Sequence, residues 1–214
     1  RYQLGKDSKE ISADLTFKKA KLGDKEFFLE KGNFSFKDML LKLDVSLRSK
    51  SSLEPLKLTG TIPFSPSLPI DLRAESHGDG LKFLDGLSNG SLIWNKGRLD
   101  LRLLVRGTLE SPEANGFLVV EGGDFTVMDK DLKDLEGSIV FDFNRLEIEN
   151  LKANIGTKGT IESYGAISLF SDRIDEKEPL TIDINQVPFD FRSMDVEVAS
   201  NLIIKGSLVK PKIG

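Results

Sequence analysis

Cysteine is absent from this 214-residue sequence, which rules out disulfides, thiolate nucleophiles and cysteine-based zinc sites. There is one histidine, too few for a histidine metal site or a catalytic relay. One tryptophan and two tyrosines leave few side chains for stacking against sugars. The composition therefore predicts no metal and no other cofactor, and it gives little support to a carbohydrate-binding or adhesive β-solenoid.

Neither sign of charge dominates, because 30 basic residues face 34 acidic ones. A net charge of -4 supplies no electrostatic footprint for nucleic acid. The longest apolar runs, such as Phe117 to Val120, are far shorter than the roughly 20 residues that cross a bilayer as a helix. We expect no nucleic-acid partner and no membrane span here. Any membrane anchor is expected in other parts of a longer protein from which this segment comes.

Apolar and polar residues alternate through most of the chain, the period of a strand with one apolar face. Examples are Ile11 to Phe17, Leu41 to Leu47, Leu99 to Val105 and Leu180 to Ile184. Turn-forming Gly, Asn and Asp residues between the runs favour antiparallel hairpins. About 16 such strands at about 4.8 Å would extend on the order of 75 Å.

Two segments depart from the alternation. Leu81, Phe83, Leu84 and Leu87 have helical spacing, which predicts one short helix that plugs or caps something. The stretch from Pro63 to Pro69 contains three prolines, and proline cannot donate to a central ladder. We therefore predict a boundary there, between segments 1–62 and 68–214.

Three glycines, Gly32, Gly90 and Gly137, are each followed by bulky apolar residues two, four, nine and eleven positions later. This spacing predicts a strand, a turn of about four residues and a second strand, with the bulky side chains on one face. A second pattern, Gly-x-Leu-x-x-Pro, occurs at Gly107 to Pro112 and at Gly206 to Pro211.

Three stretches carry a family resemblance: GTLESPEANG from Gly107, LEGSIVFDFNRLEI from Leu135 and KGSLVKPKIG from Lys205. They resemble the C-terminal region of the TamB family, long AsmA-like bacterial envelope proteins with a chloroplast-envelope counterpart. The resemblance covers roughly residues 68–214, and the sequence style suggests a cyanobacterial member.

The resemblance implies an all-β fold, an elongated antiparallel β-taco (a half-pipe) with a hydrophobic interior. It also implies a periplasmic bridge, anchored in the inner membrane, that carries phospholipids to the outer membrane and supports outer-membrane biogenesis. Phospholipid acyl chains and an outer-membrane β-barrel protein are the implied partners. The alternative function is a scaffold or chaperone that assembles or translocates outer-membrane β-barrel proteins by strand addition.

The predicted groove lining takes its residues from the Gly-led sets and the later alternating runs. It comprises Phe34, Phe36, Leu41, Leu43, Leu92, Trp94, Leu99, Leu101, Ile139, Phe141, Leu146, Ile148, Ile161, Ile182 and Ile184. The same residues could instead fill a closed sandwich or solenoid core, where alternating apolar faces usually lie.

Candidate catalytic and metal-binding groups were sought as well. His77 lies in a Gly-rich stretch typical of a loop, and Asp129, Asp131 and Asp134 do not match the calcium-loop spacing. Paired carboxylates for glycoside hydrolysis stay open, because Asp and Glu occur on every polar face. We expect no enzyme.

Overall fold

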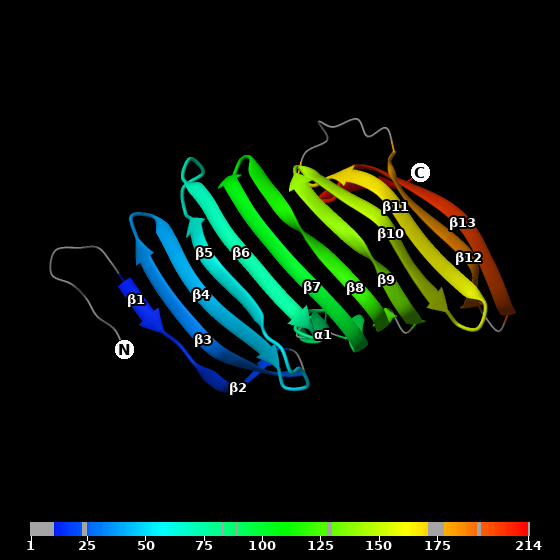
Figure 1. The fold of residues 1–214 in the computed structure, drawn as a ribbon, viewed down its shortest axis with the longest axis horizontal. Coiled ribbons are helices and arrows are strands. Elements are labelled where there is room, and N and C mark those ends of the chain that lie inside the picture. The colour runs from blue at the N-terminus through cyan, green and yellow to red at the C-terminus, as the bar shows by residue number, and fades with distance from the viewer. Residues whose placement is uncertain are drawn as a thin grey trace.

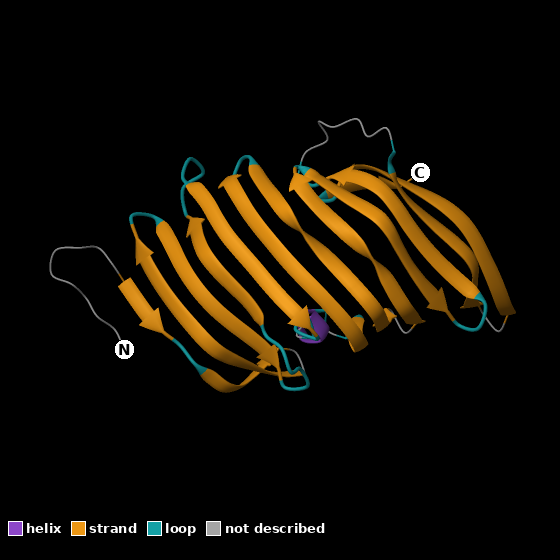
Figure 2. Cartoon of the chain, viewed as in Figure 1, coloured by secondary structure: helices purple, strands orange, loops and turns teal. Residues whose placement is uncertain are grey.

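The structure is a computed structural model that describes residues 11–22, 25–82, 84–88, 90–127, 130–170, 178–191 and 194–213. Its elements are almost all strands (Figures 1 and 2). In chain order they are β1 (Ile11–Asp14), β2 (Phe17–Leu22), β3 (Lys25–Lys37), β4 (Leu40–Ser49), β5 (Leu56–Pro63), β6 (Pro69–Gly78), α1 (Leu84–Leu87), β7 (Leu92–Thr108), β8 (Pro112–Val127), β9 (Lys130–Phe143), β10 (Arg145–Ile155), β11 (Gly159–Ser168), β12 (Leu180–Phe191), β13 (Met194–Ser207) and β14 (Lys210–Ile213).

The 14 strands of the described residues form one open sheet in which sequence neighbours pair antiparallel from β3 to β14. This confirms the predicted all-β antiparallel fold. β1 and β2 both pair with β3, since the predicted Ile11 to Phe17 run is split before Phe17. Thirteen strand positions at about 4.8 Å extend on the order of 60 Å.

Residues paired across antiparallel strands point to the same face, so the register shows how the faces differ. One row of partners from β3 to β11 consists of Gly32, Val45, Leu58, Ala74, Leu103, Gly116, Phe141, Leu146 and Ile167. The adjacent row on the other face consists of Lys31, Ser46, Lys57, Glu75, Arg102, Phe117, Val140, Glu147 and Ala166. One face is therefore apolar along the sheet, and the other is mostly charged and polar.

The sheet curls around its apolar face. Helix α1, about 6 Å long, lies against β7 and also against β2 and β3, although β3 and β7 would be about 19 Å apart in a flat sheet. Gly116 permits a close approach of β8 to β7: at φ 146° its missing Cβ would lie 1.9 Å from the Arg102 carbonyl oxygen. Several apolar side chains on this face are buried. In the described residues the short α1 is the one helix that lies over the face, so the curl of the sheet itself buries most of them. The apolar face is therefore the inside of a trough.

Two of the three Gly-led sets fold as the predicted pairs of strands, but their turns have two residues instead of about four. Phe34 pairs with Leu43 across the β3–β4 hairpin, and Phe141 pairs with Leu146 across the β9–β10 hairpin. The middle set is wrong: the predicted hairpin from Leu92 to Leu101 is part of the single 17-residue strand β7.

Gly97 explains why β7 does not reverse direction. It adopts φ 112°, and its missing Cβ would lie 2.5 Å from the Gly123 Cα of the neighbouring strand. Register shifts on both sides of Lys96 accommodate this close approach. A glycine in a strand can mark a bulge as well as a turn, and here the chain bulges and continues.

The two Gly-x-Leu-x-x-Pro patterns are hairpin turns. Gly107 pairs with Pro112 between β7 and β8, and Gly206 pairs with Pro211 between β13 and β14. The proline-rich stretch at 63–69 connects β5 to β6, which are hydrogen-bonded neighbours. The sheet is thus continuous across it; the division into 1–62 and 68–214 stays a prediction, and residues 1–10 lie outside the described residues.

Candidate functional site

All 15 predicted lining residues lie on the apolar face of the trough, by strand register and by packing. Five of them are buried, the rest are half-buried and none is exposed. The buried five are Leu43, Trp94, Leu99, Leu146 and Ile148. The placement on one face follows from the alternation, whereas a lipid-lining role for these residues stays a prediction.

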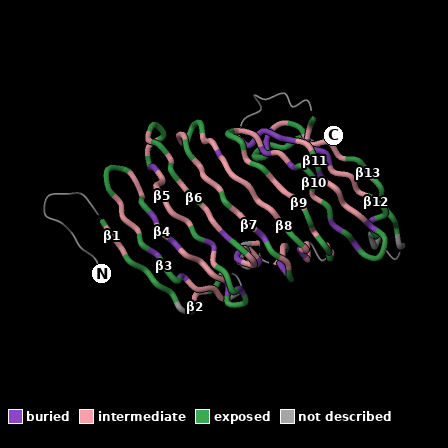
Figure 3. The backbone as a smooth tube through the Cα atoms, in the orientation of Figure 1, coloured by how far each residue is buried: buried purple, intermediate pink, exposed green. Residues whose placement is uncertain are grey.

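The five buried lining residues divide among three apolar clusters along the trough. Leu43 packs with Leu29 and Val45 at the β3–β6 end, and Trp94 and Leu99 pack with Val120 at the centre. Leu146 and Ile148 pack with Ile167 toward the C-terminal end. Figure 3 shows that buried positions recur along the whole sheet and do not gather in one core.

Several lining residues were missed because the prediction followed only the Gly-led sets and selected runs. These residues include Leu29, Val45, Leu103, Val105, Leu118, Val120, Phe125, Leu135, Leu151, Ile167 and Leu180. The alternation itself was the signal that could have found many of them, since Val45, Leu103 and Leu180 lie in runs that the sequence identifies as strands. Bulges in β8 and β9 hide Phe125 and Leu135 from such a pattern.

A short segment between β6 and β7 covers the centre of the trough. It contains α1, and Leu81 and Leu84 line an apolar pocket of about 200 Å³ together with Trp94, Phe125 and Leu151. This confirms a short helix that caps something, but α1 spans Leu84–Leu87 only, and Phe83 lies outside the described residues. We call residues 79–82 and 84–88 the cap.

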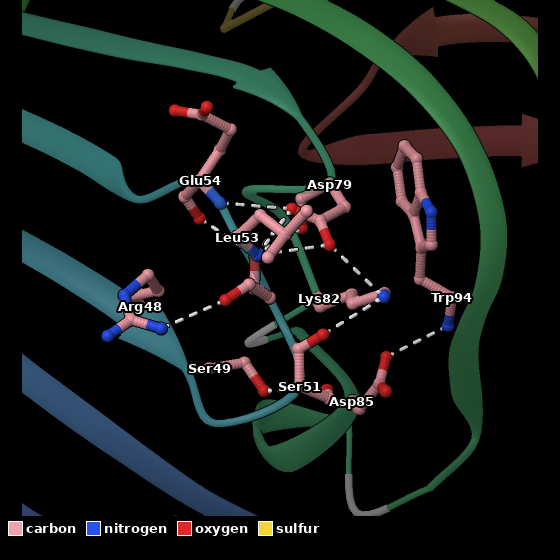
Figure 4. Close-up of polar contacts among 10 residues, drawn as sticks. Arg48, Ser49, Ser51, Leu53, Glu54, Asp79, Lys82, Asp85 and Trp94 are labelled. Atoms are coloured by element: carbon pink, nitrogen blue, oxygen red, sulfur yellow. Dashed lines mark hydrogen bonds and ion pairs between the residues drawn. The ribbon is translucent and has the colours of Figure 1, made fainter.

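The cap is tied to the β4–β5 turn by one carboxylate (Figure 4). Asp79 accepts hydrogen bonds from the Ser52 hydroxyl at 2.8 Å and from the Leu53 and Glu54 amides at 3.0 and 3.1 Å. Its partner Lys82 lies 3.1 Å away. Partial burial acts to raise the pKa of Asp79, but these hydrogen bonds outweigh it, so the pKa lies below its ordinary value.

A second carboxylate ties the cap to the trough wall. Asp85 is buried and accepts a 2.9 Å hydrogen bond from the Trp94 amide. The indole of Trp94 packs edge-on against Phe125, with ring centroids 4.6 Å apart. Trp94 is the sole tryptophan of the sequence, so its fluorescence reports on the capped pocket.

The opposite face carries charged side chains that pair with one another. Arg98 contacts Glu121 at 2.9 Å, and Lys152 contacts Glu162 at 2.5 Å. A hollow of about 820 Å³ lies on this face. Of the residues that line it, Arg98 pairs with Glu121, and Glu149 accepts a hydrogen bond from the Ser138 hydroxyl.

The candidate catalytic and metal-binding groups lie on strands. His77 was predicted in a loop but belongs to β6, where its Nδ1 lies 3.0 Å from Asp100 Oδ1, because its backbone continues the ladder to Asp100 of β7. Asp131 and Asp134 belong to β9 and bond to Thr126 and Asn154, and Asp129 lies outside the described residues. In the described ranges no three His, Asp or Glu residues are grouped to hold a metal ion.

Comparison with known proteins gives one distant relation. No protein-family model and no solved structure matches the chain. Protein TIC236, chloroplastic, from Arabidopsis thaliana is 24% identical over 147 residues, which are 67% of this chain and 7% of that protein. TIC236 is a TamB-related envelope protein, so a distant TamB-like relation is supported. The described residues contain no helix long and apolar enough to cross a membrane.

Proposed function

We propose that this chain is one section of a longer bridge in a cell envelope whose apolar trough carries phospholipid acyl chains between two membranes. The observation that carries the proposal is the apolar face, which continues from strand to strand between β3 and β11 without a charged residue in the row through Val45, Leu103 and Leu146. The similarity to TIC236 supports an envelope location. The periplasm is the location that we propose for this chain.

The energetic task of such a trough is to replace bilayer contacts. Moving an acyl chain of about 14 CH₂ groups from a bilayer into water costs about 11 kcal/mol of free energy, at about 0.8 kcal/mol per group. A continuous apolar wall removes most of that barrier. Because Leu, Ile and Phe recur along the trough and offer no directional bond, a chain can slide from one cluster to the next.

Site-specific photo-crosslinking tests the proposal. A benzophenone amino acid replaces Phe141 on the trough face or, as the control, Val140 on the opposite face of the same strand. After irradiation in bacterial cells, mass spectrometry should find phospholipid adducts at position 141 and none at position 140. The absence of lipid adducts at position 141, or equal adducts at both positions, contradicts a lipid-carrying trough.

The free ends of the sheet favour a second function, a scaffold for β-barrel proteins by strand addition. In the described residues β1 and β2, which both pair with β3, lie at one end of the sheet and β14 lies at the other, and an open edge can pair with another strand. β14 contains Pro211, Lys210 and Lys212 and β2 contains three lysines, features that protect an edge, so β1 is the better candidate. Crosslinking at Ser12 should then capture unfolded β-barrel proteins; capture of none contradicts this function.

A further inference from the structure

The two long edges of the trough are made of different hairpin turns. The turns that follow β3, β5, β7, β9 and β13 lie along one long edge, the upper edge in Figure 1. Each of these turns exposes a large apolar side chain. We call this set the apolar edge: Met39, Phe64, Leu109, Phe143, Leu208 and Val209, which are from 48% to 60% exposed.

The opposite long edge is different. Its turn after β4 exposes Leu53, and its turn after β10 consists of Gly156, Thr157 and Lys158. In its third described connection, between β6 and β7, Leu81 and Leu84 face the pocket. Among the described turns, exposed apolar side chains therefore concentrate on one edge.

Two residues of the apolar edge occupy strained backbone positions. Asp38 and Met39 form a two-residue turn with φ of 50° and 63°, a geometry in which hairpins prefer Asp-Gly. Phe143 has φ 54° in the two-residue turn before Arg145, where Gly is also preferred. Bulky side chains at such positions destabilise the fold, and strain of this kind clusters at functional sites. Met39 and Phe143 are therefore unfavourable for the stability of the fold in two independent ways, through exposed apolar surface and through backbone strain.

The apolar edge is continuous with the trough. The Phe64 ring packs edge-on against Phe36 of the trough wall, with centroids 5.3 Å apart. Phe143 is the cross-strand partner of Ala114, which is buried on the trough face. Successive turns of this edge are two strands apart, about 10 Å. A row one side chain wide lacks the compact apolar centre of a protein interface, but it suits single flexible chains.

On the basis of the proposed function, we infer that the apolar edge is the threshold over which acyl chains of single phospholipids enter and leave the trough from its side. The headgroup stays in water while the chain crosses the edge, and the exposed side chains lower the barrier by contacting CH₂ groups during the crossing. The opposite edge contains the β4–β5 turn and the cap, which Asp79 ties together, and it has no part in this transfer.

A vesicle-transfer assay tests the inference. The triple variant M39G/L109S/F143G removes three side chains of the apolar edge and creates the favoured turn pairs Asp-Gly and Gly-Asn. The control L53S/V140S/Y164S removes three exposed apolar side chains from elsewhere. Each protein is mixed with phosphatidylcholine vesicles that contain a self-quenched fluorescent phospholipid. The initial rate of dequenching reports transfer, and native mass spectrometry reports the lipid bound at equilibrium.

The edge variant should transfer lipid about fourfold more slowly than the wild type, the factor for losing the contact of one CH₂ group. The control variant should transfer lipid at the wild-type rate. The edge variant should bind as much lipid at equilibrium as the wild type. Its melting temperature should be unchanged or raised by about 2–4 °C, because strain is removed.

Other outcomes separate the two proposals. If the edge variant binds and transfers lipid as the wild type does, the threshold inference is wrong but the lipid trough is not contradicted. The same conclusion follows if the control variant is slowed as much as the edge variant. A wild-type protein that binds no lipid overturns both. If the triple variant does not fold, M39G and F143G are compared singly by the same criteria.

Discussion

The two faces of this sheet belong to the same strands but obey different chemistry. On β9 and β10, Phe141 and Leu146 face the trough while their neighbours Val140 and Glu147 face the other way. The trough face contains three apolar clusters, and the opposite face contains exposed ion pairs. The apolar interior of this protein is therefore one face of the sheet, made from alternate residues of each strand. One face can be altered while the other is kept.

The largest expected effect comes from a charge placed in the trough. Leu146 is 7% exposed, so Leu146→Lys buries an ammonium group without a partner and should lower the free energy of unfolding by about 3–5 kcal/mol. Urea denaturation followed by circular dichroism measures the change.

The matched control is Val140→Lys on the opposite face. Position 140 is exposed and faces Glu147 across the strands, so the free energy of unfolding should change by less than about 0.5 kcal/mol. Equal losses in the two variants would show that the faces do not differ as their exposure indicates.

The next effect concerns the cap. Asp79→Asn removes the charge that accepts hydrogen bonds from Ser52 and two backbone amides and should cost about 2 kcal/mol. Trp94 emission should shift to longer wavelength as the cap loosens. The control is Asp71→Asn, which affects an exposed pair with Arg106 on the opposite face and should leave both the stability and the Trp94 emission unchanged. An equal emission shift in Asp71→Asn would contradict the role of Asp79 in holding the cap.

The cap also predicts a pH dependence. The pKa of Asp79 is lowered in the folded state, so its stabilisation is complete above the unfolded value of about 4 and is lost as the pH falls through the folded value. As the pH falls below about 4, the wild type should therefore lose more stability than Asp79→Asn. Identical acid titrations of the two proteins, followed by Trp94 fluorescence, would contradict the role of Asp79.

The smallest effect is expected on the charged face. Arg98 and Glu121 form a 2.9 Å contact, but their side chains are 79% and 62% exposed. Arg98→Gln should therefore change the free energy of unfolding by less than about 0.5 kcal/mol. A loss above about 1 kcal/mol, measured by urea denaturation at low salt, would show that this face stabilises the sheet more than exposed ion pairs do.

Particular elements show how far the sequence could be interpreted. The hairpin that joins Phe141 to Leu146 was predictable because alternation and a short turn are local signals. The same spacing failed at Gly97, since a bulge depends on the close approach of Gly123 from the next strand. His77 failed in a similar way, because a Gly-rich stretch hides a residue whose ladder partner lies on β7.

By itself, the sequence determined that this protein is an antiparallel sheet with one apolar face, because side-chain alternation is a property of each strand alone. The curl of this face, the cap that Asp79 holds across it and the exposed apolar turns along one edge appear only in the folded chain. These features depend on strand order and on contacts between residues far apart in the chain. No local pattern encodes them.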